Sequence, residues 1–449
     1  MMAERDSSPE HIAATSANAS RLPAMVRAMR HRNFQLFFSG QLISLIGTWM
    51  DTAAEALLVY RLTGSSLLLG TVAFAGQVPV FLLASFGGMV ADREDRRRVV
   101  ICTQAASMIF AAVLAFLTLS KRVTVWEVIF LAACMGVVNA FDIPTRQAFL
   151  VEMVGREDLM NAIALNSSMF NGARVIGPVI AGILVYKIGE GWCFFSNSVS
   201  YIAVIAGLLM MRLPARVRQK QEASRLQHIA EGFRFVRNTA PIMALLLLLG
   251  LVSLVAMPYS VLMPIFAETI LHGTARTYGL LMGATGVGAL TGALTLATRK
   301  GVRGLGKWVA MACAGFGATL VLFAFSHWFI VSLLLLIPAG FCMMLQMASS
   351  NTLIQAMVPD RLRGRTMAVY SMMFMGMAPL GALISGALAE RIGAPWTLAS
   401  GGCIAILGAA AFARHLPKIR VEARQLIIAQ GMAGGDPAQE MTASPRNIR

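Results

Sequence analysis

The sequence has few charged residues. Only 13% of its 449 residues are Asp, Glu, Lys or Arg, and 57% are hydrophobic, whereas about 25% of a soluble globular domain is charged. A soluble protein of this length could not cover so much apolar surface with so few polar side chains. The composition therefore predicts that lipid is the solvent for most of the chain.

The sequence also lacks the patterns of several functional classes. It has no GxxxxGK[ST] loop for ATP, no CxxC pair and no nucleophile–base pair, and its six histidines are scattered. We therefore expect no enzyme, no metal site and no bound cofactor. The net charge of +16 would suit nucleic acid, but no basic region is interleaved with aromatic residues, so that partner is not expected. The first 30 residues have no apolar core, so we expect no cleavable signal peptide.

Long apolar runs are abundant. About 20 such residues are needed to cross the hydrocarbon core of a bilayer, and the sequence contains twelve runs of about that length. They lie near 34–59, 67–91, 99–119, 124–142, 161–186, 192–212, 242–267, 277–297, 308–326, 328–350, 366–390 and 396–413. The sequence thus predicts an all-α membrane protein with twelve transmembrane helices in two six-helix halves.

A polar, basic segment between the sixth and seventh runs divides the chain. The predicted segments are a cytoplasmic tail (1–33), a first half (34–212), a cytoplasmic linker (213–241), a second half (242–413) and a second cytoplasmic tail (414–449). With both termini inside, inner segments hold 31 of the 38 Lys and Arg residues and outer loops hold six, as the positive-inside rule requires. We expect a multi-pass protein of the bacterial inner (plasma) membrane.

The two halves repeat each other. At a spacing of 204 residues, the stretch 153–192 matches 357–396 at 14 of 40 positions, without a shift in register. Two six-helix halves in parallel repeat favour a transporter whose substrate path lies between them.

A charged motif, "GGMVADREDRRR", follows the second run. Gly88 would allow close helix packing, and Asp92 lies where the chain leaves the membrane. A positive-inside loop would explain the arginines but not the acids among them. Acids and arginines in one short loop can form charge-assisted bonds to neighbouring helix ends.

This loop resembles the loop 2–3 signature of the major facilitator superfamily, G-x-x-x-D-R-x-G-R-R. The matching residues are Gly88, Asp92, Arg93, Arg96 and Arg97, while Asp95 replaces the usual glycine. The resemblance implies the major facilitator fold and a conformational latch. In that latch, Asp92 would hold the first half to the start of the eleventh span, at 363–365.

A second motif, "NAFDIPTRQAFLVEMV", lies at the inner end of the fourth run. Pro144 predicts a helix end, with Asp142 and Arg146 on either side of the break. Together with "FSGQLISLIGTWM" and "LLVYRLTGSSLLLG", this wording resembles the bacterial branch of the superfamily that includes macrolide-efflux and enterobactin-export proteins. The resemblance implies that Asp142 joins the loop 2–3 arginines in a charge relay.

The fifth run contains "NGARVIGPVIAGILV". Gly172, Gly177 and Gly182 would let another backbone approach closely, and Pro178 would bend the helix. This motif resembles the span-five motif of drug antiporters in the superfamily. Arg174 is a basic residue about 20 Å from the start of the run, so it should face a polar cavity or a partner acid.

Two acids, Asp51 and Glu55, interrupt the first run in "GTWMDTAAEALLVY". Asp51 lies about 25 Å along the predicted helix, and Glu55 lies one turn further on the same face. Related sequences usually have glutamine at both places, and a carboxylate can bind a proton that glutamine cannot. We assign proton coupling to Asp51, with Arg174 tuning it, and Glu55 is either a second coupling residue or an interface residue.

Other polar residues are candidates for lining a central cavity: Gln41, Asn139, Asn171, Tyr259 and Gln346. The whole pattern favours a monomeric secondary transporter that exports amphipathic small molecules by alternating access. Its expected partners are the lipid bilayer, the substrate and protons, with the proton gradient as the energy source of an antiport cycle. The alternatives are a siderophore exporter, a facilitator or importer of small molecules, and a non-transporting membrane sensor.

Overall fold

A computed structural model describes residues 24–212, 225–299 and 301–430 of the protein. Within these residues, twelve helical segments are long and apolar enough to cross a membrane. The predicted all-α architecture of twelve spans in two halves is therefore confirmed. Most of the first predicted tail, part of the linker and the end of the second tail lie outside the described residues.

The first half contains one short 3-10 helix and six long α-helices. They are η1 (Ala24–Arg30), α2 (Arg32–Thr63), α3 (Ser66–Arg93), α4 (Arg96–Leu119), α5 (Val125–Val154), α6 (Leu159–Ile188) and α7 (Glu190–Met210). The second half follows a connecting helix, α8 (Arg225–Asn238). It consists of α9 (Ala240–Val255), α10 (Tyr259–Ile265), the π-helix η2 (Phe266–Ile270), α11 (Ala275–Ala297), α12 (Leu305–Ala324), α13 (Phe329–Met357), α14 (Asp360–Ile392) and α15 (Ala394–Ala429).

Local sequence signals begin and end these helices. Asp95 caps α4, because its side chain accepts a hydrogen bond of 3.2 Å from the Arg98 amide. Asp95, which stands where the loop 2–3 signature usually has glycine, is thus a helix cap. Its backbone is extended and does not require glycine. At the other end of the membrane, Gly64 ends α2 with a φ of 63°, in the left-handed region that favours glycine.

Helix α5 does not end at Pro144. It continues to Val154, so the predicted break is wrong. Proline removes one backbone donor, but hydroxyl side chains can satisfy freed carbonyls inside a membrane. The carbonyl freed by Pro144 is that of Ala140, four residues earlier, and the adjacent Phe141 carbonyl accepts from the Thr145 hydroxyl at 2.7 Å. Because the helix is continuous, the side chains four residues apart around the proline share one face.

Two other boundaries differ from the sequence prediction. The run predicted as one helix over 242–267 is divided between α9 and α10, and α10 begins directly after Pro258. Helix α15 continues to Ala429, well beyond the predicted end of the last span at residue 413. Hydrophobicity indicates where a chain crosses lipid, but it does not indicate where a helix breaks or extends into water.

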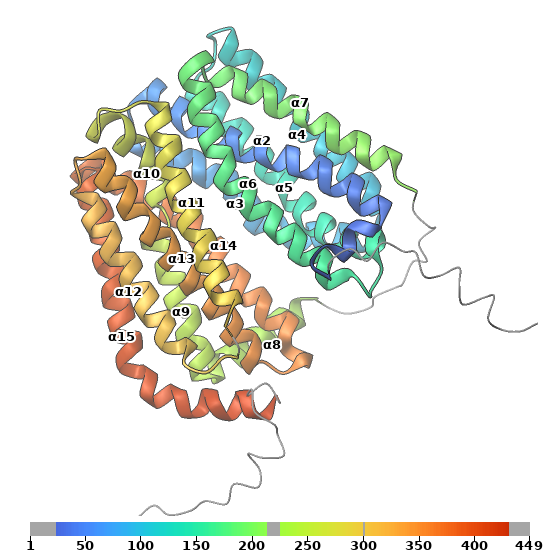
Figure 1. The fold of residues 1–449 in the computed structure, drawn as a ribbon, viewed down its shortest axis with the longest axis vertical. Helices are drawn as coiled ribbons and strands as arrows, with labels where there is room; N and C mark the ends of the chain where they lie inside the picture. The colour runs from blue at the N-terminus through green and yellow to red at the C-terminus, as the bar shows by residue number, and fades with distance from the viewer. Residues whose placement is uncertain (1–23, 213–224, 300, 431–449) are drawn as a thin grey trace, which may run out of the picture.

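The two halves are bundles that lie side by side (Figure 1). We call the face of the molecule at which α2 begins the terminal face, and the face at which α2 ends the closed face. Between the halves, α3 packs on α14 and α6 packs on α11. Helix α8 belongs to the second bundle, where it packs against the start of α14.

Glycine pairs bring the two halves together at these contacts. A Cβ added to Gly70 of α3 would lie 2.5 Å from the Ala382 oxygen of α14. One added to Gly182 of α6 would lie 2.6 Å from the Ala275 oxygen of α11. Only a residue without a side chain permits such close backbone contact in a membrane. Both contacts lie near the closed face, so the halves are joined there.

Candidate functional site

Asp51 lies in the interior of the first half, where α2 packs against α7. Gly47, one turn earlier, permits the approach, since an added Cβ would lie 2.6 Å from the Asn197 Oδ1 and 2.8 Å from the Ser200 Oγ. Residues four apart share a helix face. Asp51 therefore projects toward the polar side chains of α7.

The Asp51 carboxyl is not fully satisfied there. Its Oδ1 is buried without a hydrogen-bond partner, and so is the Nδ2 of Asn197. A buried polar atom without a partner costs about 1–3 kcal/mol. The site therefore suits a group that changes its protonation state or binds something else.

Glu55 follows Asp51 by one turn of α2 and is also partly buried. Among the residues that the structure describes, neither acid has a Lys, Arg or His within 4.0 Å in an ion pair. Glu55 lies about 12 Å before the end of α2, from eight residues at 1.5 Å each. The two carboxyls form an acidic pair inside the first half.

Arg174 faces a different side of α2. Its guanidinium lies 5.5 Å from the centre of the Trp49 ring, and it is within electrostatic range of Tyr259 in the second half. Residues two apart on a helix point about 200° apart, so Trp49 and Asp51 project in different directions. The predicted tuning of Asp51 by Arg174 does not act through an ion pair in this structure.

Arg174 instead belongs to an aromatic site near the boundary of the two halves. Trp49 also makes an edge-to-face contact with Phe170, at 5.6 Å between ring centres. Tyr259 is buried against Phe316 in the same geometry, at 6.0 Å. Here the Arg174 cation is held against an aromatic ring, so this region presents a positive charge beside apolar surface.

The glycines of the fifth run have different surroundings. A Cβ added to Gly177 would lie 2.5 Å from the Trp49 Cβ and 2.9 Å from the Met50 nitrogen. Gly182 makes the contact with α11 described above. Gly172, in contrast, has no atom within 4 Å of an added Cβ, so the close approach predicted there is wrong. Pro178 lies within α6, which continues past it.

The loop 2–3 arginines bind within their own half. Arg96 donates to the Ala148 oxygen at 2.8 Å and pairs with Glu152 at 2.9 Å. Arg97 donates to the Leu209 oxygen at 2.8 Å. Arg93 is exposed. These bonds tie the end of α3 and the start of α4 to α5 and α7.

Gly87, the residue before Gly88, makes the close helix contact in this motif, because its added Cβ would overlap the Ala140 oxygen of α5. The intended docking region at the start of α14 has other partners in this structure. Arg365 binds Glu231 of α8, and Arg363 pairs with Asp360 at 2.6 Å. The role of Asp92 as a latch stays a prediction.

Asp142 is the centre of a buried network at the base of α5. Its Oδ1 accepts hydrogen bonds from the Thr103 hydroxyl at 2.8 Å and the Gln104 amide at 3.0 Å. Its Oδ2 lies 3.4 Å from the Nε of Arg146. The two residues predicted to flank a break thus form an ion pair across one turn of a continuous helix.

The predicted cavity residues differ in burial. Gln41 and Gln346 are nearly inaccessible, with side-chain atoms that have no hydrogen-bond partner. Tyr259 is also buried. Asn139 and Asn171 are half-buried, and the Asn171 amide donates to the Ser167 oxygen at 2.8 Å.

Sequence reasoning missed the polar contacts at the closed face. Arg61 of α2 pairs with Glu190 at 2.6 Å and with Glu268 of the second half at 2.5 Å. The Glu390 carboxylate of α14 accepts hydrogen bonds from the Ser66 hydroxyl at 2.9 Å and the Leu67 amide at 3.2 Å. In the sequence, Arg61 is one of the six basic residues assigned to outer loops, and a charge at a span end is also suited to an inter-half bond.

At the terminal face, η1 is held to the start of α6. Asp158 accepts from Arg27 at 2.5 Å and lies 2.7 Å from both Arg30 and the His31 ring. Hydrogen bonds from His31 and Arg27 lower the pKa of Asp158 to about 2, and the same contact raises the pKa of Arg27.

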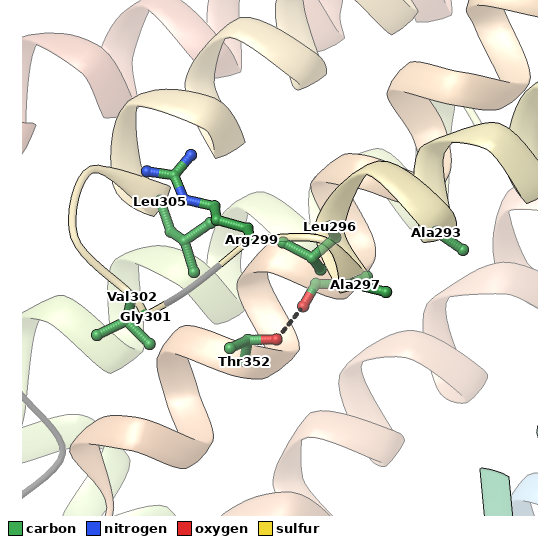
Figure 2. A pocket seen from close by; sticks show the side chains of 9 residues that line it. Ala293, Leu296, Ala297, Arg299, Gly301, Val302, Leu305 and Thr352 are labelled. Carbon is green, nitrogen blue, oxygen red and sulfur yellow. Dashed lines mark hydrogen bonds between the residues drawn. The ribbon is translucent and has the colours of Figure 1, made fainter. Parts of the chain in front are cut away.

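Two cavities open at the terminal face, one in each half. The larger, of about 630 Å³, lies between α4 and α5. Its lining includes Asp95, one face of α4 with Thr103 on it, and Phe141 of α5. The smaller, of about 380 Å³, lies at the end of α11 (Figure 2), where Arg299, Val302 and Thr352 surround it. Each lies within a single half, so neither is the path predicted between the halves.

Comparisons with known proteins agree with this architecture. Residues 24–438 match the family model described as "Transmembrane secretion effector". The staphyloferrin A transporter of Staphylococcus aureus is 26% identical over 80% of this chain and 89% of its own length. The multidrug efflux pump Tap of Mycolicibacterium fortuitum is 28% identical over 83% of this chain and 93% of its own length.

Macrolide efflux protein A of Streptococcus pyogenes is 24% identical over 83% of this chain and 94% of its own length. The enterobactin exporter EntS of Shigella boydii is 24% identical over 80% of this chain and 85% of its own length. The resemblance seen in the motifs is therefore confirmed. Among solved structures, the nucleoside transporter NupG has a TM-score of 0.64 at 13% identity, over 88% of this chain and 99% of that one. At this identity the likeness shows the fold alone.

Proposed function

This chain belongs to the transmembrane secretion effector family of the major facilitator superfamily, and we propose that it exports amphipathic small molecules by proton-coupled antiport. Members of the family are membrane transporters, so the protein is a transporter and not an enzyme. The relatives named above include a drug pump and siderophore transporters.

The observation that carries the transport mechanism is the one-sided closure of the two halves. Among the described residues, the hydrogen bonds and ion pairs that join the halves lie at the closed face, at Arg61, Tyr60 and Glu390. At the terminal face, the bonds of Arg96, Arg97 and Arg365 to other described residues stay within their own halves. An alternating-access transporter halted in one state has this arrangement.

The excess of Lys and Arg on the terminal side favours the cytoplasm as its location. With that orientation, our proposal makes this an inward-facing state of an inner-membrane protein and places both termini in the cytoplasm. An exporter loads its substrate from this state. The domain limits predicted above remain our proposal for the tails and linker.

The Arg174 site favours an amphipathic substrate. Trp49, Phe170 and Tyr259 offer aromatic surfaces beside a cation for which no ion pair is found among the described residues. Proton coupling is assigned to Asp51, with Glu55 beside it, because these acids lie inside the first bundle without an ionic partner in the described part of the chain. Protonation in one state and release in the other would then drive antiport.

A transport assay tests this function. Inverted membrane vesicles with an acidic lumen should accumulate a fluorescent cationic drug or a labelled macrolide when they contain the protein. A proton ionophore should abolish the accumulation. Equal accumulation in vesicles that contain an Arg174→Ala, Asp51→Asn double variant would contradict the proposal.

A siderophore exporter is the second candidate, since Arg174 would attract an anionic catechol or carboxylate. The two candidates differ in charge preference. Arg174→Gln should weaken binding of an anionic siderophore at least 10-fold, because a charged hydrogen bond of about 1.5–3 kcal/mol is lost, and it should change binding of a cationic drug much less. Titration of tryptophan fluorescence with each class measures both affinities.

A further inference from the structure

A stripe of polar side chains runs along one face of α2. Gln41, Ser44, Thr48, Asp51 and Glu55 are spaced three or four residues apart, so they share a face of the helix. From Gln41 to Glu55 the stripe spans 15 residues, about 21 Å of the helix. Gln41 and Ser44 are buried, so this is not a solvated surface.

The stripe faces further buried polar groups on α7. Asn197 is 0% exposed, and Tyr201, one turn further, is 3% exposed. The Tyr201 hydroxyl lies 3.4 Å from the Thr48 hydroxyl. It is also within electrostatic range of both Asp51 and Asp142. Tyr201 therefore lies near acids of both α2 and α5 inside the first half.

Three amide side chains in this region have polar atoms without a partner. They are the Oε1 of Gln41, the Nδ2 of Asn197 and the Oε1 of Gln104, and the Asp51 Oδ1 is a fourth such atom. Buried polar groups are almost always hydrogen-bonded, to protein or to ordered water. The Asp51 carboxyl and the Asn197 amide lie within interaction range of each other, whereas the Gln41 and Gln104 oxygens have no such neighbour among the described residues and leave polar surroundings in which internal water is bound.

The polar groups nearest the terminal face are those around Asp142. Gln104 donates to Asp142, and so does Thr103. Thr103 also lines the cavity of about 630 Å³ between α4 and α5 that opens beside Asp95. Polar groups thus lie at intervals from the acids of α2 to a cavity at the terminal face, and the aromatic site at Arg174 is not among them.

We propose that these side chains hold a file of water molecules that conducts protons between Asp51 and Asp142 inside the first half. The protonated Asp51 carboxyl gives its proton to a neighbouring water, successive waters exchange protons past Tyr201, and the last water protonates the Asp142 carboxylate or releases the proton to the cavity. The proton route is then separate from the substrate path. This proposal rests on the proton coupling proposed above.

Radiolytic labelling with mass spectrometry tests for the water directly, because hydroxyl radicals form from bound water. Tyr201 should be oxidised at least 5-fold faster than Tyr278, although both are 3% exposed. The Asn197→Leu variant should remove that difference. Equal labelling of the two tyrosines in the wild type would overturn the proposal.

A transport measurement then tests conduction. Asn197→Leu should lower substrate-driven proton movement in vesicles at least 10-fold while substrate affinity stays within 2-fold. Ser198→Ala is the matched control, because that buried hydroxyl of α7 donates to the Met108 oxygen, away from the stripe. Full proton movement in Asn197→Leu would overturn the water file alone. No proton movement in the wild type, with transport intact, would instead overturn the proposed coupling.

Discussion

The two halves share a fold but differ in the charge of their interiors. The 204-residue repeat places Asp142, with Arg146 one turn later, opposite Gln346 and Ser350. In the first half, this position holds an ion pair and two further hydrogen bonds. In the second half, both side-chain polar atoms of Gln346 lack a partner.

The glycine contacts at the closed face, in contrast, are symmetric, because each half contributes the same kind of contact. Gly182 of the first half packs on α11, and its repeat partner Gly386 packs on α3 of the first half. The repeat therefore keeps the symmetry that closing and opening require. Charge is concentrated in the first half, where Asp51, Glu55 and Asp142 lie deep in their helices. We infer that movement is shared between the halves, whereas proton chemistry belongs to the first.

Exchanging Asp142 for an apolar residue should have the largest effect. Asp142→Leu leaves the Arg146 guanidinium and two hydrogen-bond donors unpaired, and breaking a buried pair costs about 3–5 kcal/mol. Gln346→Leu should change the free energy of unfolding by less than about 1 kcal/mol, because its amide has no bonds to lose. Denaturant unfolding in detergent measures both. An equal loss in the two variants would contradict the asymmetry between the halves.

Enlarging the symmetric glycines should have the next largest effect. Gly182→Leu and Gly386→Leu should each open the closed face, because overpacking costs about 1–3 kcal/mol in the closed arrangement. That cost shifts the conformational equilibrium about 5-fold or more, since about 1.4 kcal/mol corresponds to a factor of ten. Distances between spin labels at residues 62 and 392, which are exposed at this face in opposite halves, report the change. Gly172→Leu is the control, since its added side chain meets open space.

Removing the Arg61 bonds should have a smaller effect in the same direction. These groups are partly exposed, and exposed ion pairs contribute about 0–1 kcal/mol. Arg61→Gln should therefore shift the spin-label distances by no more than a few-fold in population. High salt should have a similar effect on the wild type. A shift as large as that of Gly182→Leu would mean that charge, and not packing, closes this face.

The contact of η1 with Asp158 should respond to acid without affecting transport. The folded pKa of Asp158 is lowered to about 2, so its stabilisation is complete above its ordinary value of about 4. It is lost as pH falls from about 4 through 2. The hydrogen-exchange protection of residues 24–31, taken relative to the intrinsic rate at each pH, should fall in that range, and also in Asp158→Asn at neutral pH. Glu157→Gln, at an exposed neighbour, should leave the exchange unchanged.

Much of the fold could be predicted from the sequence, because each span must bury its backbone bonds in lipid and so requires a long apolar helix. The glycines at 177 and 182 were also predictable, since small residues permit close helix contact. The break after Val255 and the continuation past Pro144 were not, because neighbouring side chains decide whether a helix survives a proline.

Only part of the site could be predicted. A carboxylate in an apolar run identified Asp51, and the spacing of Gln41, Ser44 and Thr48 before it was a further visible signal. The importance of Asn197 and Tyr201 could not be predicted, because it depends on α7 packing against Gly47 of α2. The face of α2 against which Arg174 of α6 lies depends on the same three-dimensional packing.

The most direct test of the central claim counts the protons exchanged per substrate molecule in vesicles that contain wild type or Asp51→Asn. Gln346→Glu, which introduces an acid into the second half, is measured beside them. The account predicts that Asp51→Asn loses substrate-driven proton movement while still binding substrate, and that Gln346→Glu does not change the count of protons. Unchanged proton movement in Asp51→Asn would contradict the assignment of proton coupling to the first half.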